Sequence, residues 1–383
     1  MHMPTSVPAI PPKPPSAPQP IVFTGERRDF RRMLTRGSAL ELITLGFYRF
    51  WLATDMRRHL WSHTSVDGDT AEYTGLAKEL LIGFLVALAI LVPIYLAYFF
   101  LGLEAERYQA FVSIPLFAFF YLFTHFALYR ARRYRLTRTI WRGVRFWMGG
   151  SGWSYAWRAT LWGVLVWTTA GLALPWRTAA LERFKMRYTS YGDLQGSFVA
   201  TGGSFFKQGW WLWLLAWPAA FMIFPLPFIY AMYKAIEWRW WMSGIRIGDV
   251  RFENSLDIAA LLGIYWKVVG WMLLLLALLG VWFGAVFGIG WAMVAPTSGS
   301  TELKMAIITA HPAVLVALGL GYLLMAIGFN IVMRLYLTRD VWMKVAATTV
   351  VHNLAAADNV TAQGDVVNAL GEGFADSLDV GGF

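Results

Sequence analysis

The chain contains no cysteine, which excludes disulfide bonds, thiolate nucleophiles and cysteine-ligated metal sites. Charged residues make up only 15% of its 383 residues, against about 25% in a soluble globular domain. No Walker loop, HExxH or GxSxG motif is present, and histidine occurs only six times. We therefore expect no catalytic, cofactor or metal site, and a protein that is not an enzyme.

Apolar residues are abundant instead, at 57% of the chain with a mean hydropathy of +0.49. They gather in long runs, which is typical of a polytopic membrane protein. Two pairs of runs predict full helical hairpins, 76–101 with 111–129 and 259–293 with 312–335. The loop of the first hairpin contains Glu104, Glu106 and Arg107, and the loop of the second contains Glu302 and Lys304.

The formal charge of +10 comes from basic residues that lie beside these apolar runs. Anionic lipid headgroups and the positive-inside rule explain that placement, so we expect membrane lipids as partners and no nucleic acid. The segment after the first hairpin is strongly basic: it contains Arg130, Arg132, Arg133, Arg135, Arg138, Arg142 and Arg145. The rule places this segment and both chain termini in the cytoplasm, and the two hairpin loops outside.

Two further apolar stretches, 156–175 and 209–233, have basic residues on both flanks. Gly171, Pro175, Pro225 and Pro227 interrupt them or end them, and proline breaks a helix by removing a donor. Re-entrant or shallow hairpins that return to the same side satisfy both the charges and the breaks, and we favour them. Two ordinary membrane spans are the alternative.

The chain also shows an internal repeat, because residues 44–65 match residues 169–190 without a gap. Gly46 and Gly171 occupy equivalent points, so we expect 40–45 to enter the membrane, Gly46 to turn, and 48–58 to return. Short β-prone segments around Asp-Gly or Gly-Asp follow each helical pair and predict β-hairpins. The approximate units are 23–72, 73–145, 146–197, 198–251 and 252–351.

The fold that these patterns predict is an all-α polytopic membrane protein with a small cytoplasmic β-hairpin layer. It consists of about five degenerate units, each a helical hairpin plus a β-hairpin, with some helical hairpins re-entrant. The domain limits are a disordered, proline-rich tail at 1–20, a membrane domain at 21–345 and an acidic tail at 352–383.

Four arginines recur at the ends of the predicted units, and they are Arg58, Arg138, Arg183 and Arg239. Anchoring at the membrane interface explains them most simply. A ring around a central opening that binds anions or headgroups is the sharper hypothesis. Glu79, His125 and Lys267 lie within or beside apolar runs and are candidate intramembrane polar groups, with snorkelling of Lys267 as the alternative.

Glycines recur every fourth residue at Gly280, Gly284 and Gly288, and Gly321 and Gly328 form a similar stripe in the next apolar run. Small residues at this spacing allow helices to approach closely. The partner helix lies either in the same chain or in another subunit, so a homo-oligomer or a membrane complex is possible.

The chain resembles the YjgN-like family of uncharacterised bacterial inner-membrane proteins. The similarity is carried by FTGERRDF (23–30), LITLGFYRFW (42–51), SYGDLQGSFVATG (190–202), the 233–255 run with its IEWRWW core, and the GEGFADSLDVGGF ending. It covers about residues 21–383 and implies a multi-pass protein of the bacterial inner membrane. The resemblance brings no established activity, and it suggests a membrane metallopeptidase as a partner.

With no catalytic motif visible, two functions remain. A channel or transporter-like protein for a lipid, anion or small amphiphile is favoured, because broken helices often line substrate sites. A non-catalytic scaffold or accessory subunit of a membrane protein complex is the alternative.

Overall fold

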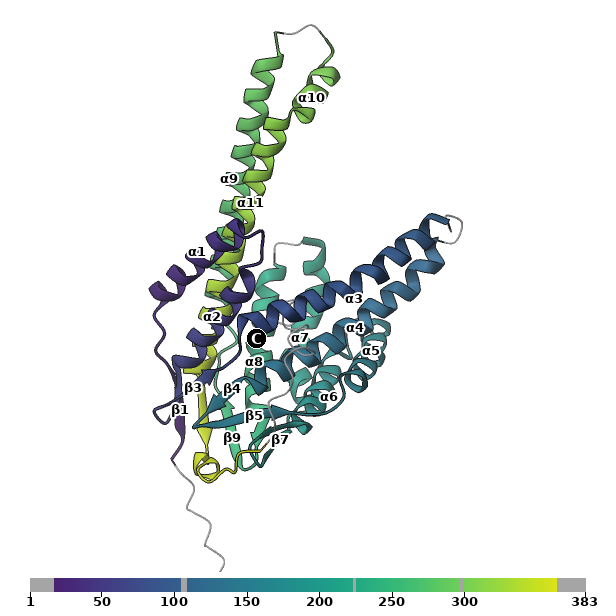
Figure 1. The fold of residues 1–383 in the computed structure, drawn as a ribbon. Helices are drawn as coiled ribbons and strands as arrows, with labels where there is room; N and C mark the ends of the chain where they lie inside the picture. The colour runs from purple at the N-terminus through teal and green to yellow at the C-terminus, as the bar shows by residue number, and fades with distance from the viewer. Residues whose placement is uncertain (1–16, 105–108, 223–224, 297–298, 364–383) are drawn as a thin grey trace, which may run out of the picture.

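The computed structural model describes residues 17–104, 109–222, 225–296 and 299–363 (Figure 1). Residues 1–16 and 364–383 of the two predicted tails, and Glu106 and Arg107 of the first hairpin loop, lie outside the described residues. Gln19 and Pro20, which close the predicted N-terminal tail, already belong to the first strand.

Pairs of helices alternate with pairs of strands along the chain. The strands are β1 (Gln19–Phe23), β2 (Thr64–Val66), β3 (Asp69–Tyr73), β4 (Thr139–Trp141), β5 (Val144–Met148), β6 (Thr189–Tyr191), β7 (Leu194–Phe198), β8 (Ile245–Ile247), β9 (Val250–Asn254) and β10 (Thr349–His352). The helices are α1 (Arg27–Ile43), α2 (Arg49–Ser62), α3 (Ala77–Glu104), α4 (Gln109–Thr137), α5 (Gly152–Thr168), α6 (Leu174–Arg187), α7 (Gly202–Met222), α8 (Leu226–Gly244), α9 (Leu262–Val294), α10 (Thr301–Ala310), α11 (Pro312–Met333) and α12 (Val341–Ala347). A π-helical segment, η2 (Arg334–Asp340), joins α11 to α12, and a 3-10 turn, η3 (Leu354–Ala357), follows β10.

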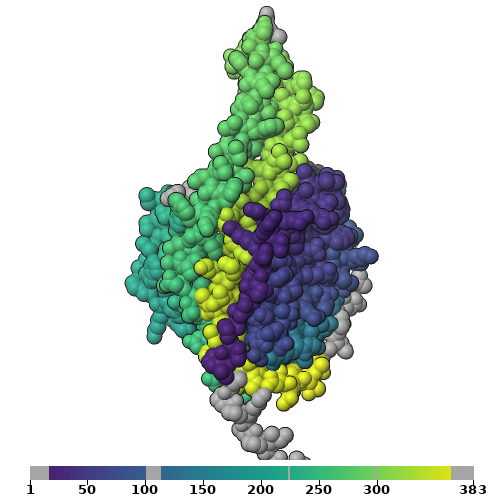
Figure 2. Space-filling view, turned by 90° about the vertical axis from the view of Figure 1, so that its left-hand side faces the viewer, coloured from purple at the N-terminus to yellow at the C-terminus, as the bar shows by residue number. Residues whose placement is uncertain are grey.

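The ten strands close into an antiparallel barrel, in which β1 pairs with β2 on one side and with β10 on the other. The predicted all-α class with a small β-hairpin layer is therefore wrong. A layer of hairpins would leave unpaired N–H and C=O groups along two edges, and closure removes both edges. The closing contact joins the first strand to the last, with Pro20 opposite Val350. Figure 2 shows this N-terminal segment running beside the C-terminal one.

The hairpin turns follow from local sequence. Asp67 and Gly68 between β2 and β3 both have positive φ (55° and 85°), as do Arg142 and Gly143 between β4 and β5 (46° and 74°). Two successive residues with positive φ form the turn whose twist matches paired strands. The Asp-Gly signal at Asp67 thus marks a hairpin correctly.

The two glycines of the sequence repeat occupy turns of the same geometry. Leu45 and Gly46 have φ of 52° and 90°, and Ala170 and Gly171 have φ of 49° and 89°. In each turn a threonine hydroxyl donates back to its helix, from Thr44 to the Leu40 carbonyl and from Thr169 to the Leu165 carbonyl. α1 thus turns into α2, and α5 into α6, in the same way.

Each second helix of a pair leads directly into a strand, as α2 does into β2 and α4 into β4. Helices α2, α4, α6, α8 and α12 therefore meet the barrel at one end. The strands start at Thr64 in β2 and Thr139 in β4, which are 139 − 64 = 75 residues apart. The position equivalent to Arg58 in α4 is accordingly Arg133. Arg138, which the sequence pattern groups with Arg58, therefore lies five residues beyond the equivalent position.

Within the described residues, four helical stretches are long and apolar enough to cross a membrane: Ala77–Phe100, Ile114–Thr137, Leu262–Val294 and Pro312–Ala347. They form two hairpins, α3–α4 and α9–α11, that leave the helical end of the barrel in different directions (Figure 1). Large apolar side chains cover their outer faces, and apolar surface of this extent marks a contact with a membrane or with another protein. Whether α5–α6 and α7–α8 re-enter the membrane stays a prediction.

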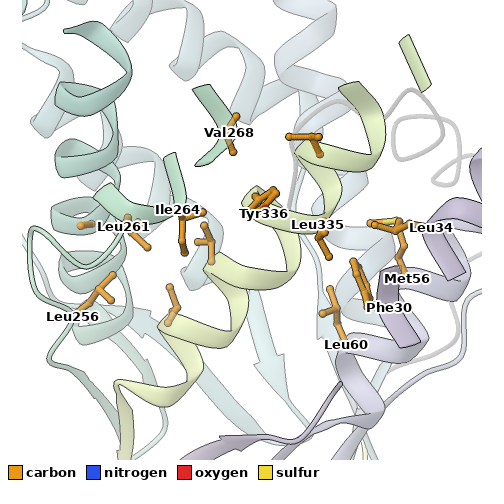
Figure 3. Packing of buried hydrophobic residues seen from close by; sticks show 14 of the residues in the cluster. Phe30, Leu34, Met56, Leu60, Leu256, Leu261, Ile264, Val268, Leu335 and Tyr336 are labelled. Carbon is orange, nitrogen blue, oxygen red and sulfur yellow. The ribbon is translucent and has the colours of Figure 1, made fainter. Parts of the chain in front are cut away.

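The largest hydrophobic cluster joins the first unit to the last (Figure 3). Phe30 and Leu34 of α1 pack with Leu60 of α2 and with Leu335 of η2. Arg339 of η2 donates to the Gly25 carbonyl at 2.7 Å, and Arg27 pairs with Asp340 at 3.0 Å. This packing holds the first helices and η2 together near the place where β1 and β10 close the barrel.

Candidate functional site

A chamber of about 410 Å³ lies where the inner helices meet the barrel. Helices α2, α4, α5, α6, α8 and α12 all contribute to its wall. Its ionisable lining comprises Arg132, Arg135, Glu182, Lys185, Lys234 and Glu237, and its aromatic lining comprises Trp61, Tyr155, Trp238, Trp241 and Trp342. Four cations against two carboxylates leave the wall with an excess of two positive charges.

Glu182 is the central acid of the chamber. It accepts from Arg132 of α4 at 2.8 Å and contacts Lys185 one helical turn further along α6. Burial alone would raise the pKa of Glu182, but the charges of Arg132 and Lys185 outweigh it and lower the pKa to about 2. Glu182 is therefore ionised at neutral pH, and its two partners together exceed its charge by one.

Lys185 is held in a less favourable setting. Burial lowers the pKa of Lys185, and neighbouring Arg132 lowers it further, against the opposing effect of Glu182. Across the chamber, Lys234 and Glu237 of α8 form a second pair at 2.6 Å. The cations of the chamber thus outnumber its carboxylates, and an anion that enters the chamber would find cations to pair with.

Two tryptophans stand between the chamber and the barrel. The rings of Trp61 (α2) and Trp342 (α12) stack at 5.1 Å between centroids, with 24° between their planes. Each indole N–H donates to a threonine at the start of a strand, Trp61 to Thr139 at 3.0 Å and Trp342 to Thr64 at 2.9 Å.

The threonine hydroxyls are themselves fixed by the helices. Thr64 donates to the Leu60 carbonyl at 2.7 Å, and Thr139 donates to the Arg135 carbonyl at 2.8 Å. A hydroxyl has one proton to donate and lone pairs to accept with, so each threonine serves both bonds at once. The stacked pair is therefore held from both sides.

The barrel lumen beyond the tryptophans is a second cavity, of about 280 Å³. Side chains from the strands line it, among them Val66, Phe146, Ile247, Phe252 and Val351. No residue with a formal charge is among the described residues of its wall. The Tyr191 hydroxyl donates to the Trp141 carbonyl at 2.8 Å, so it is already satisfied. The lumen is an apolar compartment.

The two cavities share four wall residues: Trp61, Leu136, Thr139 and Trp342. They therefore adjoin at the tryptophan pair. A charged chamber and an apolar lumen are thus neighbours, with the tryptophan pair in the wall between them.

The segment 353–361 crosses the far end of the lumen. Leu354 and Ala357 of η3 line the cavity. Three contacts tie this segment to the barrel turns: Asp358 to Arg142 at 3.0 Å, the Asn353 amide to the Asp249 carbonyl at 3.4 Å, and the Thr361 N–H to Asp193 at 3.1 Å. We call residues 353–361 the strap.

None of the four recurrent arginines lies in the chamber wall. Arg58 donates to the Gly75 carbonyl at 3.0 Å and Arg183 to the Ala200 carbonyl at 3.4 Å, which are equivalent contacts 125 residues apart. Arg239 donates to Gln208 at 2.9 Å. Each fastens a second helix to a neighbouring segment.

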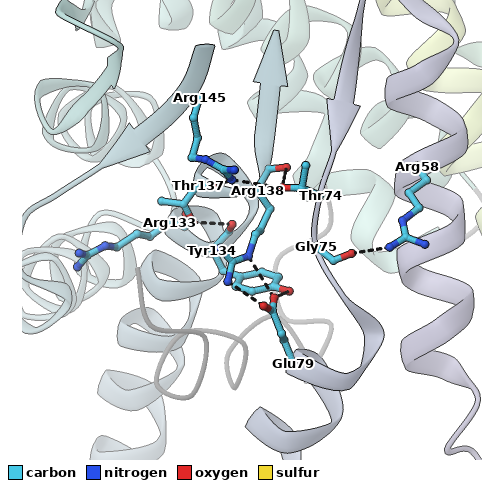
Figure 4. Close-up of polar contacts among 9 residues, drawn as sticks. All are labelled: Arg58, Thr74, Gly75, Glu79, Arg133, Tyr134, Thr137, Arg138 and Arg145. Carbon is cyan, nitrogen blue, oxygen red and sulfur yellow. Dashed lines mark hydrogen bonds and ion pairs between the residues drawn. The ribbon is translucent and has the colours of Figure 1, made fainter. Parts of the chain in front are cut away.

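Arg138 has a different surrounding, drawn with Arg58 in Figure 4. It forms a two-point ion pair with Glu79 of α3, at 2.9 and 3.1 Å, and Glu79 also accepts from the Tyr134 hydroxyl at 2.7 Å. The candidate polar group Glu79 thus fixes the start of α3 against the end of α4.

The other two candidate polar groups lie apart from it. His125 is buried on α4, 3.4 Å from Arg177, and Lys267 lies on an exposed face of α9. Neither lines the chamber.

The predicted glycine stripe is divided between two environments. Gly321 and Gly328 of α11 face Trp282 and Leu275 of α9 so closely that an added Cβ would force a shift. At Gly280, Gly284 and Gly288 of α9 an added Cβ would meet nothing within 4 Å among the described residues. The predicted break residues all lie at helix junctions, because Pro175 and Pro227 begin α6 and α8 and Pro225 caps α8.

Sequence reasoning missed the chamber residues themselves. Arg132 and Arg135 were seen only as part of a basic run, and Glu182 and Lys185 were not singled out. Nor did a sequence pattern single out His59 of α2 and its C-cap residue His63, four residues further on, whose rings lie 4.2 Å apart. Among the described residues no group of three or more His, Asp or Glu could hold a metal ion.

These features define a protein with several membrane-compatible apolar helices, whose inner helices enclose a charged chamber above an apolar barrel lumen. The chain belongs to a family described as "Bacterial protein of unknown function (DUF898)", whose model matches residues 18–377. This confirms the YjgN-like resemblance. No curated protein matches the chain, and neither does any solved structure.

Proposed function

We propose that this protein is a multi-pass protein of the bacterial inner membrane that moves a lipid, an anion or a small amphiphile through its central path. The observation that carries this proposal is the contact between the two cavities at Trp61 and Trp342. Cavities in series, separated by a narrow aromatic pair, are the form expected of a conduit.

The proposed orientation follows from charge. The basic run from Arg130 to Arg145 lies at the end of α4 and in the first barrel strands after it, whereas the four apolar stretches extend away from the barrel. By the positive-inside rule the barrel and both chain termini face the cytoplasm.

Flux through proteoliposomes tests the proposal. Full-length protein is reconstituted, and efflux of inorganic phosphate, decyl phosphate and lysophosphatidylglycerol is compared with efflux from protein-free liposomes. We expect at least one of the three to leave faster with protein present, and Ala71→Phe, which places a large ring in the lumen wall, to abolish the difference. Lys207→Gln is the matched control, because Lys207 is exposed on α7 and lines neither cavity.

Efflux rates equal to those of protein-free liposomes for all three compounds would contradict a conduit. The scaffold or accessory subunit would then be favoured. The open glycine face of α9, at Gly280, Gly284 and Gly288, supports that second role, since it leaves room for a helix from a second copy or from a partner such as a membrane metallopeptidase. Crosslinking in the native membrane, with Gly284→Leu as the blocking variant, distinguishes the two.

A further inference from the structure

The two cavities differ in chemistry in a way that selects a class of ligand. The chamber wall has four cations and two carboxylates, whereas the lumen wall has no formal charge among its described residues. We infer that the path binds an amphiphile with an anionic head and one alkyl chain, with its head in the chamber and its chain in the lumen. This inference rests on the proposed function and names the ligand of the same site.

The head position follows from the cations around Glu182. That carboxylate receives both Arg132 and Lys185, so the three groups together have a net positive charge. An anion beside Lys185 would offset this excess in a partly desolvated setting, where charge-assisted hydrogen bonds are strongest. A cationic head would add to the excess and be repelled.

The chain position follows from the lumen. Apolar cavities stay dry and gain by taking up hydrocarbon, and about 150 Å³ suffices for a six-carbon ring. The lumen, at about 280 Å³, therefore has room for roughly ten carbons of one chain.

The junction suits the link between head and chain. The flat faces of Trp61 and Trp342 line the junction, and their N–H groups are already bound to Thr139 and Thr64. The junction therefore offers apolar contact and no donor for a polar head. In the bound state the head therefore has its ion-pair partners in the chamber, while its chain extends past the rings.

Equilibrium binding to the full-length protein in nanodiscs tests the inference, with empty nanodiscs as the blank. The probes are decyl phosphate, decanoate, butyl phosphate and decyltrimethylammonium. Decyl phosphate or decanoate should bind at least tenfold more tightly than decyltrimethylammonium, and decyl phosphate at least tenfold more tightly than butyl phosphate. Preference between the first two distinguishes a phosphate-headed source from a fatty acid.

Two variants separate the ends of the ligand. Lys185→Gln should weaken the two ten-carbon anions by about tenfold, while Ala71→Phe should remove the advantage of decyl phosphate over butyl phosphate. Ala357→Phe, which narrows the lumen from the strap side, repeats the second test if Ala71→Phe does not fold. Lys207→Gln should change nothing.

Equal binding of the cationic and anionic decyl probes, or no effect of chain length, would overturn the inference. The proposed function fails separately. Binding as described without flux would contradict the conduit and support the ligand class. Phosphate flux without an effect of chain length on binding would support the conduit and contradict the ligand class.

Discussion

Trp61 and Trp342, from the first and last units of the chain, stack face to face at the junction of the chamber and the barrel lumen. Each is bound to the strand-leading threonine of another unit: Trp61 to Thr139 and Trp342 to Thr64. The junction of the two cavities is thus built from contacts between units.

Trp61→Phe removes the indole N–H of Trp61 together with part of its ring, and leaves a phenyl face toward Trp342. Trp61→Phe should destabilise the protein by more than about 1 kcal/mol, because it loses one hydrogen bond, whose usual net value is about 1 kcal/mol, and part of the stack on Trp342, while Thr139 keeps its bond to the helix. Thermal unfolding in detergent measures the change. Trp210→Phe is the control, since Trp210 is exposed on α7, and an equal loss in both variants would contradict a role for the Thr139 bond.

The Glu182 cluster predicts a specific sensitivity to acid. The pKa of Glu182 is lowered to about 2 in the folded protein, whereas an unperturbed glutamate titrates near 4.3, about two units higher. The stabilisation is complete above about pH 4.3 and is lost as the pH falls through about 2. The unfolding temperature of the natural protein should therefore decrease as the pH is lowered between these two limits.

Glu182→Gln should remove that acid dependence. It should also destabilise the neutral protein by about 3–5 kcal/mol, because Arg132 and Lys185 lose their buried carboxylate. Glu72→Gln, at an exposed position on β3, is the control and should leave both the slope and the neutral stability unchanged. An unaltered acid slope in Glu182→Gln would show that other carboxylates dominate.

Arg142 holds the strap to the barrel turns. It pairs with Asp67 at 2.8 Å, Asp69 at 2.5 Å and Asp358 at 3.0 Å, and these acids raise the pKa of Arg142 against the opposing effect of burial. Arg142→Gln should raise amide hydrogen exchange in 353–361 severalfold, with little effect on overall stability, since exposed ion pairs contribute about 0.2–1 kcal/mol. Exchange in that segment as slow as in Arg187→Gln, on the exposed face of α6, would refute the role of Arg142.

The turns at Gly46 and Gly171 require positive φ. Gly46→Ala should cost about 1–2 kcal/mol from backbone conformation alone, because an added Cβ at Gly46 meets nothing within 4 Å among the described residues. Gly270→Ala is the matched control: it lies inside α9 with equally open surroundings, and alanine there should stabilise the helix by up to about 1 kcal/mol. Thermal unfolding that ranks the two variants in the opposite order would contradict the turn geometry.

The absence of cysteine makes the proposed membrane orientation directly testable. Single cysteines at Thr301, in the α9–α11 loop region, and at Asp193, in a barrel turn, should react from opposite sides of the membrane. We expect an impermeant maleimide added to intact cells to reach Thr301→Cys only, and to reach Asp193→Cys after permeabilisation. Labelling of both cysteines in intact cells would contradict the proposed orientation.

Local sequence determined much of this protein. Local patterns predicted the apolar runs at 76–101 and 312–335, because hydrophobicity is a property of neighbouring residues. They also predicted the turns at Asp67, Gly46 and Gly171, because glycine permits the positive φ that such turns need. The resemblance to the family was also readable from short segments.

The tertiary structure alone decided the barrel and the chamber. Barrel closure depends on Pro20 meeting Val350, and the chamber on Arg132 meeting Glu182, pairs far apart in the chain that leave no local pattern. The recurrent arginines could be recognised in the sequence because Arg58 and Arg183 form the same contact, from a second helix to a nearby backbone carbonyl, in two units. The chamber residues differ from unit to unit: α4 contributes two arginines, whereas α6 and α8 each contribute a glutamate and a lysine. They therefore form no repeated pattern in the sequence.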